Sequence, residues 1–189
     1  REQLEAEGYR LDGNAFRNGD EEWLPLYGAK MVHHYDHRFG DYADYPRGAE
    51  TTHLPEVPTA RLVDPFYVVQ PRYWVPSSEV AERLEHRWDR GWLLGWRDIC
   101  RTTDQRTVIA SIVARAGVGH KFLLMLPSAN PMQVACLLGN LVAFVFDYTS
   151  RQKVGGTSLT YFTMKQLPVL PPFTYAQSCP WADSPTPYS

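Results

Sequence analysis

A short segment near the C-terminus combines residues whose chemistry suits a phosphate chain. Residues 151–158 read Arg-Gln-Lys-Val-Gly-Gly-Thr-Ser, and a strand-like run then leads to Pro171-Pro172. Glycine lacks a Cβ, so a Gly-Gly turn lets the main chain approach a ligand closely, while Arg151 and Lys153 supply positive charge. The same turn would also serve as the entry to a strand after a long helix. The segment therefore indicates either a phosphate contact or a structural turn.

A second group of polar residues offers metal ligands. It consists of His33, His34, Asp36 and His37. Imidazole nitrogens and carboxylates bind zinc, so a metal site is one interpretation. On a strand, however, neighbouring side chains point to opposite faces, which opposes shared ligation by His33 and His34. A polar rim with packed histidines is the second interpretation, and contact with nucleic acid together with Lys30 and Arg38 is the third.

Arginines are dense in the middle of the chain. They are Arg97, Arg101, Arg106 and Arg115. Such a stripe could position a phosphate backbone, and guanidinium forks could contact guanine edges. A set of surface salt bridges is the alternative. Three acids beside arginines are interpreted as ion-pair partners rather than catalysts, namely Asp98, Asp104 and Asp147.

Catalytic signatures are mostly absent from the sequence. It contains no G-x-S-x-G, Walker A, H-E-x-x-H or G-x-G-x-x-G pattern.

Charge is distributed unevenly along the 189 residues, although the net charge is only -2. Residues 1–60 hold 6 Lys and Arg against 12 Asp and Glu, a balance of 6 - 12 = -6. Residues 61–170 hold 13 against 8, a balance of 13 - 8 = +5. A basic central body is compatible with a polyanionic partner, and a solvated basic face is the alternative.

The composition predicts a folded protein in a reducing compartment. A hydrophobic fraction of 44% and an aromatic fraction of 13% are typical of a globular chain with one or two domains. Cys100, Cys136 and Cys179 have no CxxC spacing, so we expect a cytoplasmic protein without a disulfide framework. We find no signal peptide and no apolar run long enough for a bilayer, so no membrane partner is expected. Because residue 1 is Arg, we expect a piece of a longer protein.

The pattern of residues predicts an α+β fold with one curved, mostly antiparallel sheet. Asn130-Pro131 predicts the start of a long buried helix over about 131–150, and Ser77 or Ser78 the start of a shorter helix over about 78–90. Segments expected to form strands lie at 23–35, 66–69, 73–75, 107–114, 121–126 and 158–164. A long loop is expected at 40–65. We divide the chain into a lead-in from a preceding domain (1–22), one domain (23–172) and an extended tail (173–189).

Five ordered blocks of the sequence resemble a known family. They are 24–38 (LPLYGAKMVHHYDHR), 70–76 (QPRYWVP), 91–99 (GWLLGWRDI), 104–110 (DQRTVIA) and 151–172, which begins with RQKVGGTS. The blocks resemble a region that follows the catalytic domain in type IIG-like restriction-modification methylases and related phage-defence adenine methyltransferases. That family usually has Glu-Gly at Gly28-Ala29 and His at Ser158. The order of long helix, glycine turn and Pro-Pro also resembles the end of recognition domains in type I specificity subunits.

The resemblance implies a target-recognition domain separated from its methyltransferase. The family's catalytic Asn/Asp-Pro-Pro-Tyr/Phe motif is missing, because Leu170-Pro171-Pro172-Phe173 lacks the amide or carboxylate. The implied partners are double-stranded DNA and the parent's own methyltransferase domain. S-adenosylmethionine is implied as the cofactor of the parent enzyme, and no cofactor is expected in this fragment. We expect the fragment alone to have neither methyltransferase nor nuclease activity.

Seven basic residues are the predicted DNA contacts. Those expected to position the phosphate backbone are Lys30, Arg38, Arg151 and Lys153. Those expected to contact bases, together with the loop 40–65, are Arg97, Arg101 and Arg106. Two alternatives stay open: a structural module that docks on the catalytic domain, and a metal-dependent nuclease built on the His33–His37 cluster. Blocks shared by enzymes of different specificity favour the structural alternative for the blocks themselves.

Overall fold

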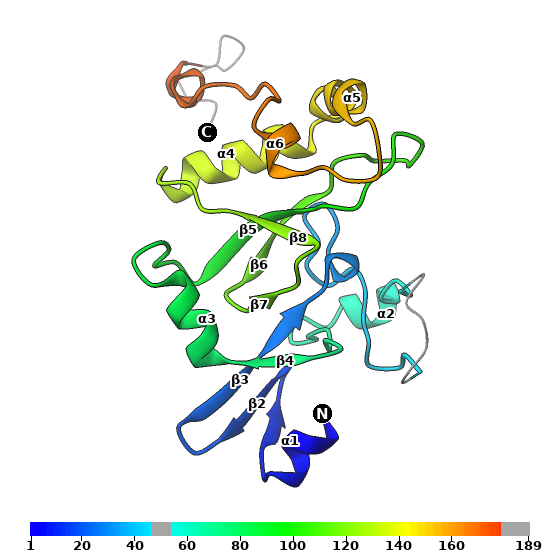
Figure 1. The fold of residues 1–189 in the computed structure, drawn as a ribbon, viewed down its shortest axis with the longest axis vertical. Helices are drawn as coiled ribbons and strands as arrows, with labels where there is room; N and C mark the ends of the chain where they lie inside the picture. The colour runs from blue at the N-terminus through cyan, green and yellow to red at the C-terminus, as the bar shows by residue number, and fades with distance from the viewer. Residues whose placement is uncertain (47–53, 179–189) are drawn as a thin grey trace. The chain divides into compact units, whose positions relative to one another are not determined.

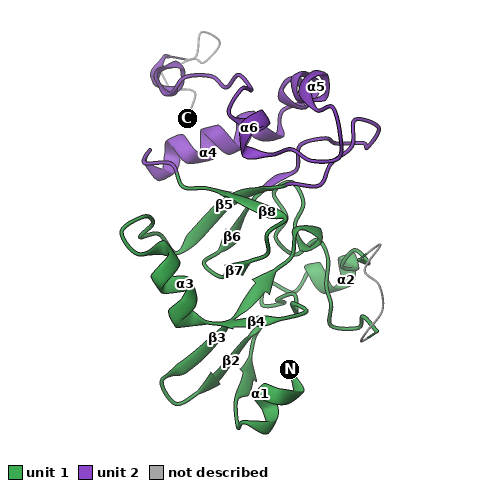
Figure 2. Cartoon of the chain, viewed as in Figure 1, with its two compact units in different colours: residues 1–97, 111–126 green, residues 98–110, 127–189 purple. Residues whose placement is uncertain are grey.

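A computed structural model of the chain describes residues 1–46 and 54–178, which fall into two compact units (Figures 1 and 2). Unit 1 comprises Arg1–Arg97 and Ser111–Leu126, and unit 2 comprises Asp98–Ala110 and the residues from Pro127 onward. Both units are drawn from two separated stretches of sequence. The chain therefore passes from unit 1 to unit 2, returns, and passes to unit 2 again.

The larger sheet of unit 1 is built around β3 (Glu21–Tyr27) and has five strands. It pairs antiparallel with β2 (Ala15–Asn18) and β4 (Trp74–Pro76), and β1 (Arg10–Asp12) pairs with β2. The short strand β7 (Gly117–Val118) pairs with β3 in the parallel direction. Two-residue loops join β1 to β2 and β2 to β3, and they begin with Gly13 (φ 63°) and Gly19 (φ 56°). Glycine adopts positive φ without strain, which suits it to this hairpin position.

The second sheet has three strands in the order β6-β5-β8. β5 (Trp92–Arg97) is its centre, flanked by β6 (Ala110–Ala114) and β8 (Phe122–Met125). β5 and β8 are antiparallel, with Gly95 opposite Leu124. Four consecutive residues of β5, Leu93 to Trp96, are buried. A continuous apolar run is expected for a strand that is covered on both faces.

Short helices and loops complete unit 1. The helices are α1 (Glu2–Ala6), α2 (Thr59–Leu62), α3 (Ser77–Leu84) and the 3-10 helix η1 (Ala29–Met31). α3 buries Val80 and Leu84, which join a core that includes Met31, Trp88 and Phe122. Burial of such side chains is the main stabilising contribution to the unit.

Unit 2 is mostly helical. Its elements are α4 (Pro131–Val142), α5 (Phe144–Lys153), α6 (Tyr161–Met164) and the 3-10 helix η2 (Pro172–Ala176). Asn130 caps α4 by accepting a hydrogen bond from the amide of Gln133 at 2.9 Å. Asn140 ties the C-terminal segment to α4, because its Oδ1 accepts from the amide of Leu170 at 3.1 Å and its Nδ2 contacts the Tyr175 hydroxyl.

The structure is α+β, as predicted, but several elements differ from the expectations. Two sheets replace the single curved sheet, and the helix expected over 131–150 is divided at Ala143 into α4 and α5, which are bent by 62°. The helix expected over 78–90 ends at Leu84, and Pro76 rather than a serine is its N-cap. Residues 158–164, expected as a strand, contain α6, whose N-cap Thr160 accepts from the amide of Thr163.

The expected lead-in (1–22) and the expected long loop (40–65) both contain regular secondary structure. β1 and β2 lie within residues 1–22 and pair in the sheet of β3, and α2 lies within the loop expected at 40–65. Residues 47–53 of that loop and most of the expected tail, 179–189, lie outside the described residues. The part of the tail that is described begins with η2.

Two further properties of the described residues are the lengths of their apolar helices and the state of their cysteines. No single helix among them is long and apolar enough to cross a bilayer, although α4 and α5 would meet that length and composition test as a bent pair. Cys100 and Cys136 are free thiols, and Cys179 lies outside the described residues. Burial raises the pKa of Cys100 to about 11, so this thiol is protonated at neutral pH.

The close approach of β5 and β8 gives a first prediction. A Cβ at Gly95 would lie 2.6 Å from the carbonyl oxygen of Leu123 and 2.6 Å from the buried ring of Phe122. We expect Gly95→Ala to lower the free energy of unfolding by about 1–3 kcal/mol, because the strands must separate or the ring must move. Urea denaturation measures the change.

Gly155→Ala is the matched control, because a Cβ there would meet no atom within 4 Å and Gly155 has no positive φ. Its free energy of unfolding should stay the same or rise by up to about 1 kcal/mol. Equal stability of the two variants would contradict the assigned contact between β5 and β8.

Candidate functional site

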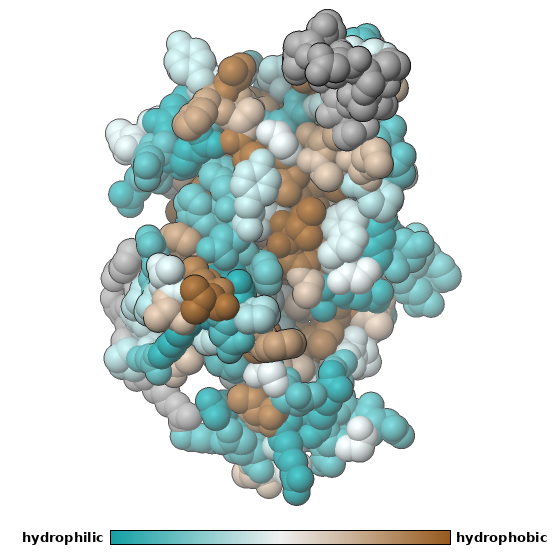
Figure 3. Space-filling view, turned by 180° about the vertical axis from the view of Figure 1, so that it is seen from behind, coloured by the Kyte–Doolittle hydropathy of each residue, from teal (hydrophilic) through white to brown (hydrophobic). Residues whose placement is uncertain are grey.

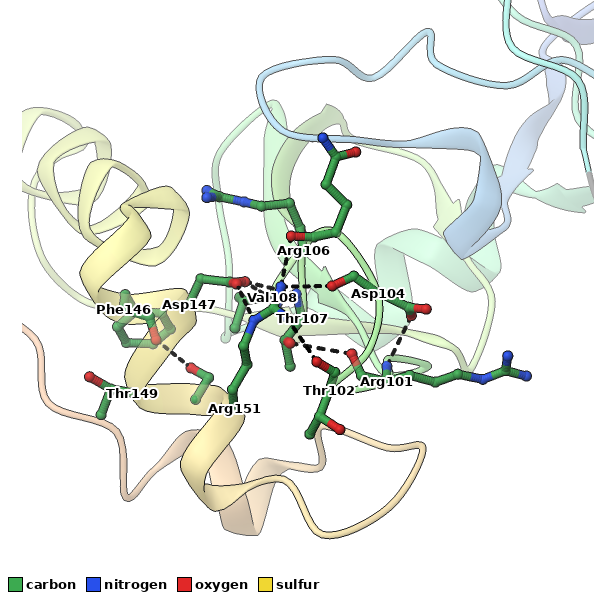
Figure 4. A network of polar contacts seen from close by, with 12 residues as sticks. Arg101, Thr102, Asp104, Arg106, Thr107, Val108, Phe146, Asp147, Thr149 and Arg151 are labelled. Carbon is green, nitrogen blue, oxygen red and sulfur yellow. Dashed lines mark hydrogen bonds and ion pairs between the residues drawn. The ribbon is translucent and has the colours of Figure 1, made fainter.

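The loop 101–106 of unit 2 is held by one arginine of α5 (Figure 4). The guanidinium of Arg151 donates to the carbonyl oxygens of Thr102 at 2.8 Å, Asp104 at 2.7 Å and Gln105 at 2.7 Å. A planar guanidinium with several donors can satisfy several acceptors at once. Arg151, predicted as a phosphate contact, thus uses its donors within the protein.

A buried carboxylate holds both Arg151 and the end of this loop. Asp147 is 4% exposed, and its Oδ1 accepts from the amides of Thr107 and Val108, each at 2.8 Å. Its Oδ2 accepts from Nε of Arg151 at 3.0 Å, one helical turn away. A buried carboxylate is stable only when its oxygens are paired in this way. The interpretation of Asp147 as an ion-pair partner is confirmed.

Arg106 occupies the break between α4 and α5. Its guanidinium donates to the carbonyl oxygen of Val142, the last residue of α4, and lies 4.4 Å from the ring centroid of Phe144, the first residue of α5. The last carbonyls of a helix lack partners within the helix. Arg106, predicted as a base contact, instead satisfies such a carbonyl and stabilises the bend.

The loop 101–106 is bonded to Arg151 through its main chain, whereas most of its side chains are in solvent. Residues 101–105 are all exposed. Arg101 is fixed through its amide, which donates to Oδ2 of Asp104 at 3.0 Å, while its side chain points away from the polar network in Figure 4. The loop therefore presents Arg101 on a main chain that is held at several points.

The Gly155–Gly156 turn leads from α5 to a short pairing with residues 98–100. The amide of Cys100 donates to the carbonyl oxygen of Thr157 at 3.1 Å, and the amide of Leu159 donates to that of Asp98 at 2.7 Å. A structural turn into an extended segment, one of the two interpretations from sequence, is therefore present.

The second interpretation of the turn concerns its outer surface. A Cβ on Gly155 or Gly156 would meet no atom within 4 Å, and both residues are exposed. Within the described part of the chain, no acceptor receives a hydrogen bond from the amides of Gly155, Gly156 or Thr157. The exposed Lys153 lies two residues before Gly155 along the chain. The turn thus offers amide donors and a cation with open space beside them.

The charges exposed on unit 2 are predominantly positive. Arg101, Lys153 and Lys165 are exposed, whereas Asp98 is 7% and Asp147 4% exposed. Asp104 is the one exposed carboxylate among the described residues of this unit. Unlike the acidic N-terminal region, this surface therefore favours an anionic partner.

Three predicted DNA contacts lie in unit 1, and two of them hold the main chain. Arg38 donates to the carbonyl oxygens of Asp64 at 3.0 Å, Tyr67 at 3.2 Å and Leu62 at 3.3 Å. Nε of Arg97 donates to the carbonyl oxygen of Val32 at 2.9 Å, and burial lowers the pKa of Arg97 to about 10. Lys30, in η1, is exposed.

The histidine cluster forms a tight turn. His33 and Asp36 exchange main-chain hydrogen bonds of 2.7 and 3.0 Å, and Tyr35 between them has a φ of 55°. The ring of His33 packs 4.7 Å from that of Phe39, and Oδ1 of Asp36 accepts from the amide of Arg38 at 2.7 Å. In the described residues no group of three or more His, Cys, Asp or Glu side chains is arranged to hold a metal ion.

Comparison with known proteins returns no counterpart for this chain: no family model, curated protein or solved structure matches it.

The Asp147 network gives the second prediction. Asp147→Ala leaves the amides of Thr107 and Val108 without their acceptor and Arg151 without its counter-charge. We expect a loss of about 2–4 kcal/mol in the free energy of unfolding, together with faster amide hydrogen exchange in the loop 101–106.

Asp104→Ala serves as the comparison, because the exposed Asp104 carboxylate accepts only from the amide of Arg101 in the described part of the chain. It should cost at most about 1 kcal/mol. Similar losses in both variants would show that Asp147 does not organise the loop.

Proposed function

We propose that the chain is the DNA-recognition region of a cytoplasmic restriction-modification adenine methylase, and that unit 2 contacts the sugar-phosphate backbone. The observation that carries the proposal is the Gly155–Gly156 turn, with its unbonded amides and open surroundings beside the exposed Lys153. Main-chain amides and lysine ammonium groups are frequent donors to phosphate oxygens. The order of blocks that resembles the methylase family supports the same conclusion.

Lys153 and the turn would supply contacts that do not depend on DNA sequence. Each neutralised phosphate releases counterions, which makes binding depend on salt. Two of the three carboxylates in the described part of unit 2, Asp98 and Asp147, are buried, so few negative charges there oppose such a partner. The residues of the turn would thus fix the position of the duplex.

Arg101 would supply the base contact. Arginine forms paired hydrogen bonds with O6 and N7 of guanine, and a binding side chain is more effective when its support is rigid. Arg151 and Asp147 provide that support from α5. In the parent enzyme a separate catalytic domain would bind S-adenosylmethionine and act on the target base after the base leaves the stack.

Four of the seven predicted contacts become positioning residues in this proposal. They are Arg38, Arg97, Arg106 and Arg151, whose guanidinium groups donate to main-chain carbonyls. Lys30, Arg101 and Lys153 keep exposed side chains and stay candidates for direct contact. The first group of basic residues thus fixes the protein's own main chain, and the second group is available for contact with DNA.

A docking module for the parent's methyltransferase domain is the second candidate function. The surface in Figure 3 is largely hydrophilic with separate apolar patches, and unit 2 exposes several large apolar side chains. The most exposed of these are Phe144 at 83%, Phe162 at 79%, Val145 at 78%, Tyr148 at 68% and Phe173 at 68%. Grouped exposed apolar side chains are typical of protein contacts. A docking module alone would show no salt-dependent affinity for duplex DNA.

Lys153→Ala tests the phosphate contact. We expect the slope of log affinity against log salt concentration for duplex DNA to become shallower by about 1, because one fewer phosphate is neutralised. Fluorescence anisotropy of a labelled duplex across a salt series measures the slope. Arg10→Ala in unit 1 removes the same charge from an exposed residue and should leave the slope unchanged.

An unchanged slope in Lys153→Ala would remove Lys153 from the interface, and an absence of duplex binding by the unaltered protein would favour the docking module. Arg151→Ala is unsuited to this test, because it also removes the three contacts to the loop 101–106.

The glycines give an independent test of the same interface. Gly155→Ala with Gly156→Ala places two methyl groups in open space, so the free energy of unfolding should not fall. If a phosphate approaches the turn closely, the methyl groups will block it and duplex affinity will drop severalfold at constant salt. Unchanged affinity with unchanged stability would show that the main chain of the turn does not touch DNA.

A further inference from the structure

A pocket of about 420 Å³ lies entirely within unit 1. Its lining combines four aromatic residues (Tyr42, Tyr45, Tyr73 and Trp74) with polar and charged ones, which are Gln70, Arg72 and the N-terminal residues 1–3. A concave site of a few hundred Å³ with aromatic walls and polar groups that fix orientation is a usual form of small-molecule site. The block 70–76, one of the five in the resemblance, contributes four of these residues.

Hydrogen bonds hold the walls of this pocket. Oδ1 of the buried Asp41 accepts from the amides of Gln70 at 2.9 Å and Ala43 at 2.7 Å, and the amide of Tyr42 donates to the carbonyl oxygen of Gln70 at 3.1 Å. In the same segment as Gln70, Nε1 of Trp74 donates to the carbonyl oxygen of Asn14 at 2.7 Å. The segments that carry the aromatic rings are therefore connected by direct bonds.

The aromatic and cationic groups suit a planar ligand. Tyr73 is 58% exposed, and the guanidinium of Arg72 lies 5.5 Å from its ring centroid. Tyr42 and Tyr45 pack edge to face, with centroids 5.8 Å apart and an interplanar angle of 73°. Aromatic rings and guanidinium planes are the groups on which unstacked bases pack in single-stranded nucleic-acid complexes.

Gln70 connects this side of the pocket to the loop between β1 and β2. Its Nε2 donates to the carbonyl oxygen of Gly13 at 2.9 Å. This bond fixes the segment that carries Arg72 and Tyr73.

We propose that this pocket binds an unstacked nucleobase, with Tyr73 and Arg72 as its stacking surface. The base belongs either to a free nucleotide or to an unpaired position of a strand, which share the same ring chemistry. The proposal goes beyond the contact of unit 2 with duplex phosphates, because it assigns a separate site in unit 1 that takes a base.

The test measures binding of two probes to the whole chain. Deoxyadenosine monophosphate is titrated by calorimetry, and a short labelled single-stranded DNA is titrated by anisotropy beside an otherwise identical strand of abasic sites. Binding of the nucleotide assigns the pocket to free nucleotides, and binding of the strand alone assigns it to an unpaired base. In both cases we expect the abasic strand to bind more weakly, because its phosphates remain but its bases are missing.

Variants of Tyr73 connect that binding to the pocket. Tyr73→Ala should weaken it by about tenfold, the effect of losing one stacking contact, while Tyr73→Phe should retain it. Phe66→Ala is the matched control, since Phe66 is 88% exposed in the same unit and does not line the pocket. Equal effects of Tyr73→Ala and Phe66→Ala, or equal binding of the abasic strand, or no binding of either probe, would overturn the proposal.

The two proposals fail separately. The duplex salt slope of Lys153→Ala concerns unit 2, and it is unaffected by an empty pocket in unit 1. Conversely, nucleotide binding that depends on Tyr73 would stand even if Lys153 made no contact with DNA.

Discussion

The loops of this protein depend on arginine guanidinium groups that donate to main-chain carbonyl oxygens. Loop carbonyls have no regular secondary-structure partner, so one side chain that donates to several of them restricts the path of the loop. Arg38 provides donors to the segment 62–67 and Arg151 to the loop 101–106, each bonding three carbonyls. Lysine could not replace them easily, because it has a single nitrogen at the end of a flexible stem. These segments are therefore held by polar contacts although most of their residues are exposed.

Two buried carboxylates complete this arrangement by accepting from loop amides. Asp41 bonds the amides of Ala43 and Gln70 in unit 1, and Asp147 bonds those of Thr107 and Val108 in unit 2. In each unit one carboxylate thus fixes two amides. Asp41 holds the wall of the pocket in unit 1, and Asp147 holds the end of the loop 101–106 in unit 2. The two surfaces to which we assign binding are therefore both fixed by a buried carboxylate that accepts from main-chain amides.

Local signals in the sequence identified the start of α4 but not its end. Asn130-Pro131 carries a capping side chain and a restricted φ, and both act within a few residues. The break at Ala143 depends on Arg106 and on Asp147, whose partners lie about forty residues away in the chain. Periodicity of apolar residues continues through the break, so it predicts one helix. The hairpins β1-β2-β3 carry a local signal in Asp12-Gly13 and Asn18-Gly19, which the expectation of a lead-in over 1–22 did not use.

Residue type also left the role of each arginine undecided. The segment 151–158 has two basic residues at nearly adjacent positions, and residue type alone treats them alike. Arg151 has an acidic residue four positions earlier on the same helix, and this spacing is the signal for an internal pair. Lys153 has no acid at that spacing, since Thr149 stands there, and it remains exposed. Basic residues that lack such a partner at helical spacing are therefore the better candidates for phosphate contact, and the spacing of charges along the helix is enough to separate these two residues. The criterion fails for Arg38 and Arg106, whose acceptors are carbonyls of distant segments and leave no trace in the side-chain sequence.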